Sequence, residues 1–205
     1  MRATIHLIGA PSDIGASVRG VGMGPDALRV ADLPGVLAGH GFNVVDGGNL
    51  AGPATPWAAP ENGLRHLDEV VAWNRAVFDA VLGALDSGHV PLLMGGDHSL
   101  AIGSISAVSR HARAMGRKLR VLWFDAHTDV NTERTSPSGN LHGMPVACLL
   151  GRGPAPLTGW SGEAAALQAD ALHFVGIRSV DADEKEAIRQ LGLQVVDMRR
   201  IDEHG

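Results

Sequence analysis

Six short apolar segments recur along this chain, and segments with a helical or loop pattern separate them. Near-continuous apolar strands are typical of a parallel sheet, whose strands are buried on both faces. Strands that alternate with helices predict an α/β fold with right-handed crossover connections. The predicted strands span residues 4–10, 42–46, 90–96, 119–126, 172–177 and 193–198.

Helical patterns fill four of the intervening segments, at residues 25–39, 63–87, 99–115 and 183–191. Pro25 is suited to the first turn of the first helix, and Ser99 lies near the start of the third. The two Gly- and Pro-rich stretches, 49–63 and 150–163, are predicted to be connections within one domain. We therefore expect residues 1–205 to form a single α/β domain without an internal repeat.

The composition is that of an ordinary globular protein, with 45% hydrophobic and 19% charged residues. A formal net charge of −5 excludes the basic footprint of proteins that bind nucleic acids or anionic membranes. The single cysteine, Cys148, rules out an internal disulfide framework and is expected to be a small buried hydrophobe. The N-terminus does not resemble a signal peptide and no long apolar stretch is present, so we expect a cytoplasmic protein.

Four polar clusters lie at or after the ends of three predicted strands. They are "GGDHS" at 95–99, "DAHTD" at 125–129, "SGNLHGMP" at 138–145 and "RSVD" at 178–181. In open α/β sheets, ligands bind outside the carboxyl ends of the strands, where such clusters meet. In extended backbone Asp125, His127 and Asp129 would share one face, and burying them together requires a positive charge between them. This arrangement favours a functional site over an ordinary polar loop.

Carboxylates and imidazoles without a thiolate suit a divalent ion such as Mn²⁺ better than structural zinc. Carboxylates can bridge two such ions, and a water between two metals is acidic enough to ionise near neutral pH, which predicts metal-assisted hydrolysis. His142, in a Gly-flanked loop, could carry protons there, although a loop histidine that contacts only water is the alternative. The remaining histidines are expected to be structural or exposed: 6, 40, 66, 89, 111, 173 and 204.

Two other motif interpretations are weaker. The spaced glycines of "GVGMGP" at 20–25 begin too far after their strand for a dinucleotide-binding turn. The order of "GGDH" and "DAH" is the reverse of that in metallophosphoesterases, where the D-x-H element comes first.

The chain resembles the ureohydrolases, and within them arginase more than agmatinase. The motifs that carry the resemblance are "MGGDHSLAIGSIS", "DAHTDVNT", "SGNLHGMPVACLLG" and "GIRSVD", and the likeness covers essentially the whole chain. It implies a three-layer α/β/α fold with a mainly parallel sheet. It also implies hydrolysis of L-arginine to L-ornithine and urea at a site with two Mn²⁺ ions, as in arginine metabolism and the urea cycle, and a homo-oligomer for a full-length form.

The resemblance assigns roles to residues by position. Four residues match metal ligands, with Asp125 in the bridging place: His98, Asp125, His127 and Asp129. His142 matches the histidine that shuttles protons. The loop that recognises the α-carboxylate corresponds to Asn131, Ser136 and Ser138, and Ser136 stands where threonine is common. Asp181 matches the acidic partner of the α-amino group, which Asn140 and Glu184 support through water.

The chain departs from the family pattern after residue 200. The family has a later strand that ends in a D-x-D pair of metal ligands, and its last two strands lie in the middle of the sheet, between those preceding "GGDH" and "DAHTD". The only D-x-D here, "DAD" at 181–183, occupies the substrate-binding position. We therefore expect a fold without its C-terminal strands, in either a fragment of an enzyme or a non-catalytic remnant that could act as a partner subunit. A third reading is an agmatinase or another guanidino hydrolase, although "RSVD" argues against agmatine, which lacks an α-carboxylate.

Overall fold

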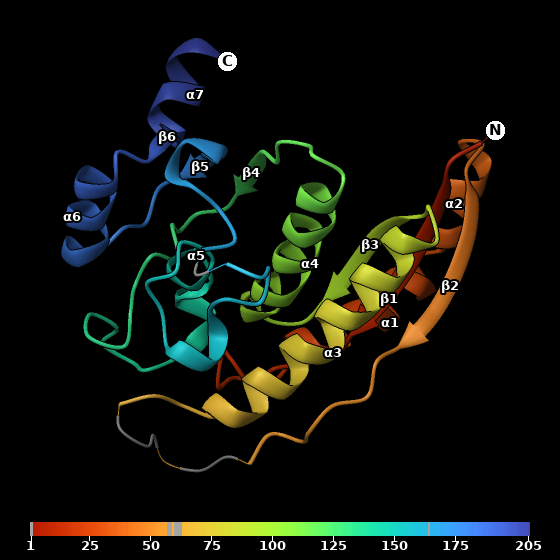
Figure 1. The fold of residues 1–205 in the computed structure, drawn as a ribbon, viewed down its shortest axis with the longest axis horizontal. Helices are drawn as coiled ribbons and strands as arrows, with labels where there is room; N and C mark the ends of the chain where they lie inside the picture. Colours follow the sequence, from red (N-terminus) through yellow and green to blue (C-terminus); the bar gives the residue numbers. More distant parts are fainter. Residues whose placement is uncertain (1, 57–58, 60–62, 164) are drawn as a thin grey trace.

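The computed structural model describes residues 2–56, 59, 63–163 and 165–205, and within them two separate three-stranded sheets (Figure 1). All neighbouring strands in both sheets are parallel. The first sheet has the order β2-β1-β3 and consists of β1 (Thr4–Ala10), β2 (Asn43–Asn49) and β3 (Val90–Gly95). The second has the order β4-β5-β6 and consists of β4 (Val121–Phe124), β5 (Leu172–Ile177) and β6 (Gln194–Asp197).

Seven α-helices lie within the described residues: α1 (Gly24–Val30), α2 (Leu33–Gly39), α3 (Leu67–Asp86), α4 (Ala101–Ala114), α5 (Pro145–Leu149), α6 (Ala182–Leu191) and α7 (Met198–His204). The predicted helix at 25–39 is in fact two helices. Asp32 adopts a left-handed conformation with φ of 59° and accepts a hydrogen bond from the Gly35 N–H, which caps α2. Pro34 lacks an N–H group and therefore suits the first turn of a new helix rather than the interior of a longer one. Helices α5 and α7 were not predicted.

Helices cover both faces of the first sheet. Alternate side chains of β1 point to opposite faces, and the apolar side chains on each face pack against a helix. Ile8 and Ala10 lie in a buried cluster with residues of α3 such as Val77, whereas Leu7 lies in a second cluster against Leu37 of α2. This is the three-layer α/β/α arrangement that the motifs implied. In the second sheet, Phe174 of β5 is fully buried in a third cluster.

The predicted burial of every strand on both faces is wrong for the outer strands. β1 and β5 are the central strands of their sheets and are largely buried, whereas β2 is mostly exposed along its length. A strand at the edge of a small sheet has a neighbour on only one side, so part of its apolar surface stays in water. Cys148, in contrast, is buried and unpaired as expected, and burial raises the pKa of its thiol to about 12.

β3 and β4 do not pair with each other, and each lies at the edge of its own sheet. Several of their apolar side chains are exposed, with 61% of the Leu122 surface and 70% of the Phe124 surface accessible to solvent. Among the residues that the structure describes, no strand joins β3 to β4, where the resemblance places two more. Among the described residues, no helix has the length and apolar character needed to cross a membrane.

The open edge of β4 should promote association of the isolated chain. Leu122→Lys places a charge on this edge, and we expect less concentration-dependent association in light scattering, with a change of less than about 0.5 kcal/mol in the free energy of unfolding. Val30→Lys is the matched control, since Val30 is 89% exposed and lies on helix α1 rather than on a strand. Equal effects of the two substitutions would contradict a role for the sheet edge.

Candidate metal centre and substrate cleft

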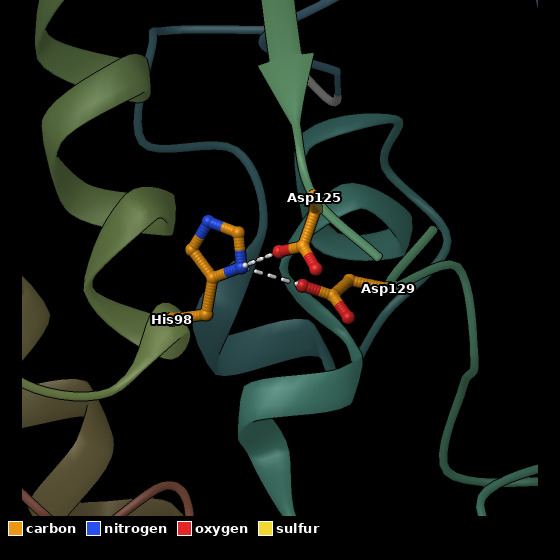
Figure 2. Close-up of side chains that lie close together, drawn as sticks. All are labelled: His98, Asp125 and Asp129. Atoms are coloured by element: carbon orange, nitrogen blue, oxygen red, sulfur yellow. Dashed lines mark ion pairs between the residues drawn. The ribbon is translucent and has the colours of Figure 1, made fainter. Parts of the chain in front are cut away.

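Side chains from the ends of β3 and β4 converge on one point. His98 begins the short 3-10 helix η2 (His98–Leu100), which follows β3, and Asp125 follows β4 directly. The Nδ1 atom of His98 lies 2.9 Å from Oδ2 of Asp125 and 2.8 Å from Oδ2 of Asp129 (Figure 2). These three residues offer ligand atoms within 4.8 Å of one another, and within the described ranges they are the one such group of histidine, cysteine and acidic residues. We name them the metal triad.

Several local contacts hold the triad in place. The His98 ring stacks on Trp123, with ring centroids 4.4 Å apart and an interplanar angle of 28°. The Asp125 N–H donates to the carbonyl of Val175, 3.1 Å away, and so extends the ladder between β4 and β5. The Asp129 carbonyl accepts a hydrogen bond from the Val146 N–H at the start of α5. The triad therefore rests on the carboxyl ends of β4 and β5 and on a short helix.

The convergence does not arise from the strand alternation that the spacing suggested. β4 ends at Phe124, and Asp129 adopts a left-handed backbone with φ of 50°. A turned loop, rather than extended backbone, thus directs Asp125 and Asp129 toward His98. His127 lies slightly apart: its side chain is 57% exposed, and its Nδ1 is 3.4 Å from Oδ1 of Asp125. The two oxygens of Asp125 therefore face two different imidazoles.

The electrostatics of the triad fit a divalent cation. Asp129 is buried, and its Oδ2 has no hydrogen-bond donor even though it lies close to His98 Nδ1. Burial opposes a charge on His98, but the adjacent carboxylates of Asp129 and Asp125 outweigh that cost and raise the pKa of the imidazole. Carboxylate oxygens and an imidazole nitrogen that converge, with one buried oxygen lacking a hydrogen-bond donor, are suitable ligands for a borderline-hard ion such as Mn²⁺.

The triad forms part of a cleft of about 410 Å³. The structure brings all the sequence-predicted site residues to this one cleft. They are His98, Asp125, His127, Asp129, Asn131, Ser136, Ser138, Asn140, His142, Asp181 and Glu184. Pro137, Gly143 and Ser179 also line it and were not singled out from the sequence. Ser179 lies within the "RSVD" motif, which could have identified it as a cleft residue from the sequence.

One wall of the cleft is the start of α6. Asp181 caps this helix and forms a reciprocal capping box with Glu184. Oδ1 of Asp181 accepts the Glu184 N–H at 2.8 Å, and Oδ2 accepts the Asn131 amide at 2.8 Å. Burial opposes ionisation of Asp181, but these hydrogen bonds outweigh it and hold the pKa of the carboxyl below its usual value. The D-x-x-E spacing of this box is a known sequence signal for a helix start, and we did not predict it.

One rim of the cleft is the loop from Ser136 to Gly143. The hydroxyl of Ser136 accepts the Gly139 N–H, and that of Ser138 accepts the Asn140 N–H, so both serines brace the loop itself. His142 lies on the 3-10 helix η3 (Leu141–Gly143) at this rim. The structure thus places an imidazole and a carboxylate in the lining of the cleft that contains the metal triad.

Comparison with known proteins gives a consistent family. The Arginase family model matches residues 3–205. The chain is 38% identical to the arginase of Brevibacillus brevis over its whole length and 40% identical to that of Agrobacterium fabrum over 98% of it. These matches span 67% and 62% of the two relatives, so the chain has about two thirds of their length.

Solved structures agree with the sequence relatives. The native arginase of Bacillus caldovelox superposes with a TM-score of 0.92 at 38% identity, covering 100% of this chain and 68% of that one. An Entamoeba histolytica arginase in complex with L-ornithine superposes with a TM-score of 0.89 at 31% identity, covering 100% of this chain and 69% of that one. On the family match, the identity and the shared fold, the chain belongs to the arginase family.

Proposed function

We propose that this chain contributes the metal-binding and substrate-recognising part of a manganese-dependent arginase, which hydrolyses L-arginine to L-ornithine and urea. The observation that carries the proposal is the metal triad, because it shares one cleft with a rim imidazole and an ionised carboxylate. Hydrolysis of a guanidinium group requires these parts: an activated water, a proton donor for the leaving amine, and groups that fix the substrate.

His98, Asp125 and Asp129 would hold one Mn²⁺ ion. His127 and Asp125 would contribute to a second ion. The 3.4 Å separation between Asp125 Oδ1 and His127 Nδ1 supports this role. When bound, the ions supply Lewis acidity.

The protein residues around the triad would orient the substrate and move protons. Asp181 faces the cleft with a lowered pKa, so it is ionised at neutral pH and can pair with the α-ammonium group. Asn131, Ser136 and Ser138 offer amide and hydroxyl groups to the α-carboxylate, while Asn140 and Glu184 would support the amino end through water. His142, on the rim formed by residues 136–143, would donate a proton to the leaving amine, because an imidazole ring can both accept and donate a proton.

The isolated 205-residue chain would bind metal weakly and release no urea. The second ion would have mainly His127 and a shared Asp125, which are too few ligands to compete with water. Two alternative functions remain testable. A non-catalytic remnant is favoured by the open edges of β3 and β4, and an agmatinase would share the metal triad but not need Asp181.

The first prediction concerns metal binding. Asp129→Ala should lower the affinity of the chain for Mn²⁺ by at least about tenfold, because it removes a triad ligand. Binding can be measured by isothermal titration calorimetry and by the electron paramagnetic resonance signal of free Mn²⁺. Asp86→Ala is the control, since Asp86 is an exposed carboxylate that contacts His111 rather than the cleft. An unchanged affinity in Asp129→Ala would remove the triad as the metal site.

The second prediction concerns completeness. In a urea-release assay with Mn²⁺ and L-arginine, we expect no activity from residues 1–205 and activity from a version extended by the C-terminal third that relatives possess. Turnover of arginine by the 205-residue chain at an ordinary enzymatic rate would contradict this. No urea from a folded, metal-loaded extended version would favour the remnant instead.

The third prediction concerns substrate choice. In the extended version, Asp181→Ala should reduce kcat/KM for L-arginine roughly a hundredfold more than kcat/KM for agmatine, because a lost polar contact penalises only the substrate that uses it. Asp183→Ala is the matched control, since Asp183 is on the same helix but does not line the cleft. Equal losses for both substrates would refute the α-amino role of Asp181.

A further inference from the structure

Asp97 is a buried carboxylate beside the metal triad that has no part in the proposed reaction. It is 6% exposed, and both of its oxygens accept hydrogen bonds from backbone N–H groups. Oδ1 accepts from Ser99 at 3.0 Å, which caps the short helix that begins with His98. Oδ2 accepts from Gly15 at 2.9 Å. One side chain thus joins the start of η2 to the loop of residues 11–17, which we call the β1 loop.

The β1 loop continues this connection to the rim of the cleft. The Gly15 carbonyl accepts the His142 N–H at 3.1 Å. Two further hydrogen bonds fix Asn140, since its amide donates to the Ala16 carbonyl at 3.2 Å and its Oδ1 accepts from the Ser17 hydroxyl at 2.9 Å. The peptide of Gly15 therefore binds Asp97 through its N–H group and His142 through its carbonyl.

The contact between Asp97 and Gly15 leaves no space for a side chain. A Cβ atom on Gly15 would lie 2.3 Å from Oδ1 of Asp97 and 2.6 Å from Oγ of Ser99. Both distances are far below van der Waals contact, and both neighbours are short buried side chains. The backbone of the β1 loop can approach η2 this closely only because residue 15 is glycine.

His142 depends on this connection for its position. Within the part of the chain that the structure describes, its ring makes no hydrogen bond, so the hydrogen bond of its backbone to Gly15 and the electrostatic attraction of Asp97 act on the position of the imidazole. We propose that Asp97 is a positioning residue: through Gly15 it couples the metal ligand His98 to the loop that carries His142. The inference rests on the proposed function only for the role of His142 in the reaction, and the coupling is measurable without turnover.

Asp97→Ala tests the coupling in the 205-residue chain. We expect Mn²⁺ affinity to fall at least about tenfold, because loss of a group that orients a ligand has this effect. We also expect the ¹H–¹³C NMR signal of the His142 Cε1–H group to shift. Asn74→Ala is the matched control, since Asn74 is fully buried and accepts the Gly103 N–H at 2.8 Å, and neither residue lines the cleft. It should lower the melting temperature as Asp97→Ala does, with Mn²⁺ affinity and the His142 signal unchanged.

A milder variant keeps the test decisive if Asp97→Ala does not fold. Ser17→Ala removes only the outer hydrogen bond to Asn140, so it should shift the His142 signal while Mn²⁺ affinity stays within about twofold. An unchanged His142 signal in Ser17→Ala, or in a folded Asp97→Ala, would overturn the proposal. Changes in Mn²⁺ affinity and in the His142 signal that are as large in Asn74→Ala as in Asp97→Ala would also overturn it. If these shifts occur but the extended chain releases no urea, the coupling stands and the arginase assignment fails.

Discussion

The structure depends on placing two carboxylates against one imidazole nitrogen at a point where water is partly excluded. Oδ2 of Asp129 is buried without a hydrogen-bond donor, and it lies 2.8 Å from His98 Nδ1. A charge pair of this kind has a large desolvation cost unless every oxygen has a partner. A protonated His98 offsets part of that cost, and a divalent cation would offset more. The fold therefore creates a need for positive charge between these carboxylates, which a metal ion can meet.

The metal triad combines residues that follow strands of both sheets. His98 follows β3 of the first sheet, whereas Asp125 and Asp129 follow β4 of the second, and the described residues include no pairing between these strands. A cation held by the triad would take ligands from both sheets and would join their carboxyl ends. Metal binding and the relative placement of the two sheets are thus expected to depend on each other.

Much of this arrangement could be predicted from the sequence, because apolar runs and polar strand exits are local signals. The ends of β1 and β5 were predicted to the residue, and the clusters after β3 and β4 do meet. The failures have physical reasons. Pro34 divides one helical pattern into two helices, and the left-handed conformation of Asp129 replaces strand alternation with a turned loop. The function of Asp97 could not be found, since its partner Gly15 is 82 residues away and only the folded chain brings them together.

The loop after β4 connects the metal triad to the start of α6. Asp125 and Asp129 point toward His98, while residues between and after them point toward α6. The hydroxyl of buried Thr128 donates to Glu184 at 2.8 Å, and the Asn131 amide donates to Asp181 at 2.8 Å. Any displacement of this loop would therefore move the carboxylates of the metal triad and the start of α6 together. The distance between the metal triad and Asp181 is thus set by one short stretch of backbone, which under the proposed function can select a substrate for its length as well as for its charge.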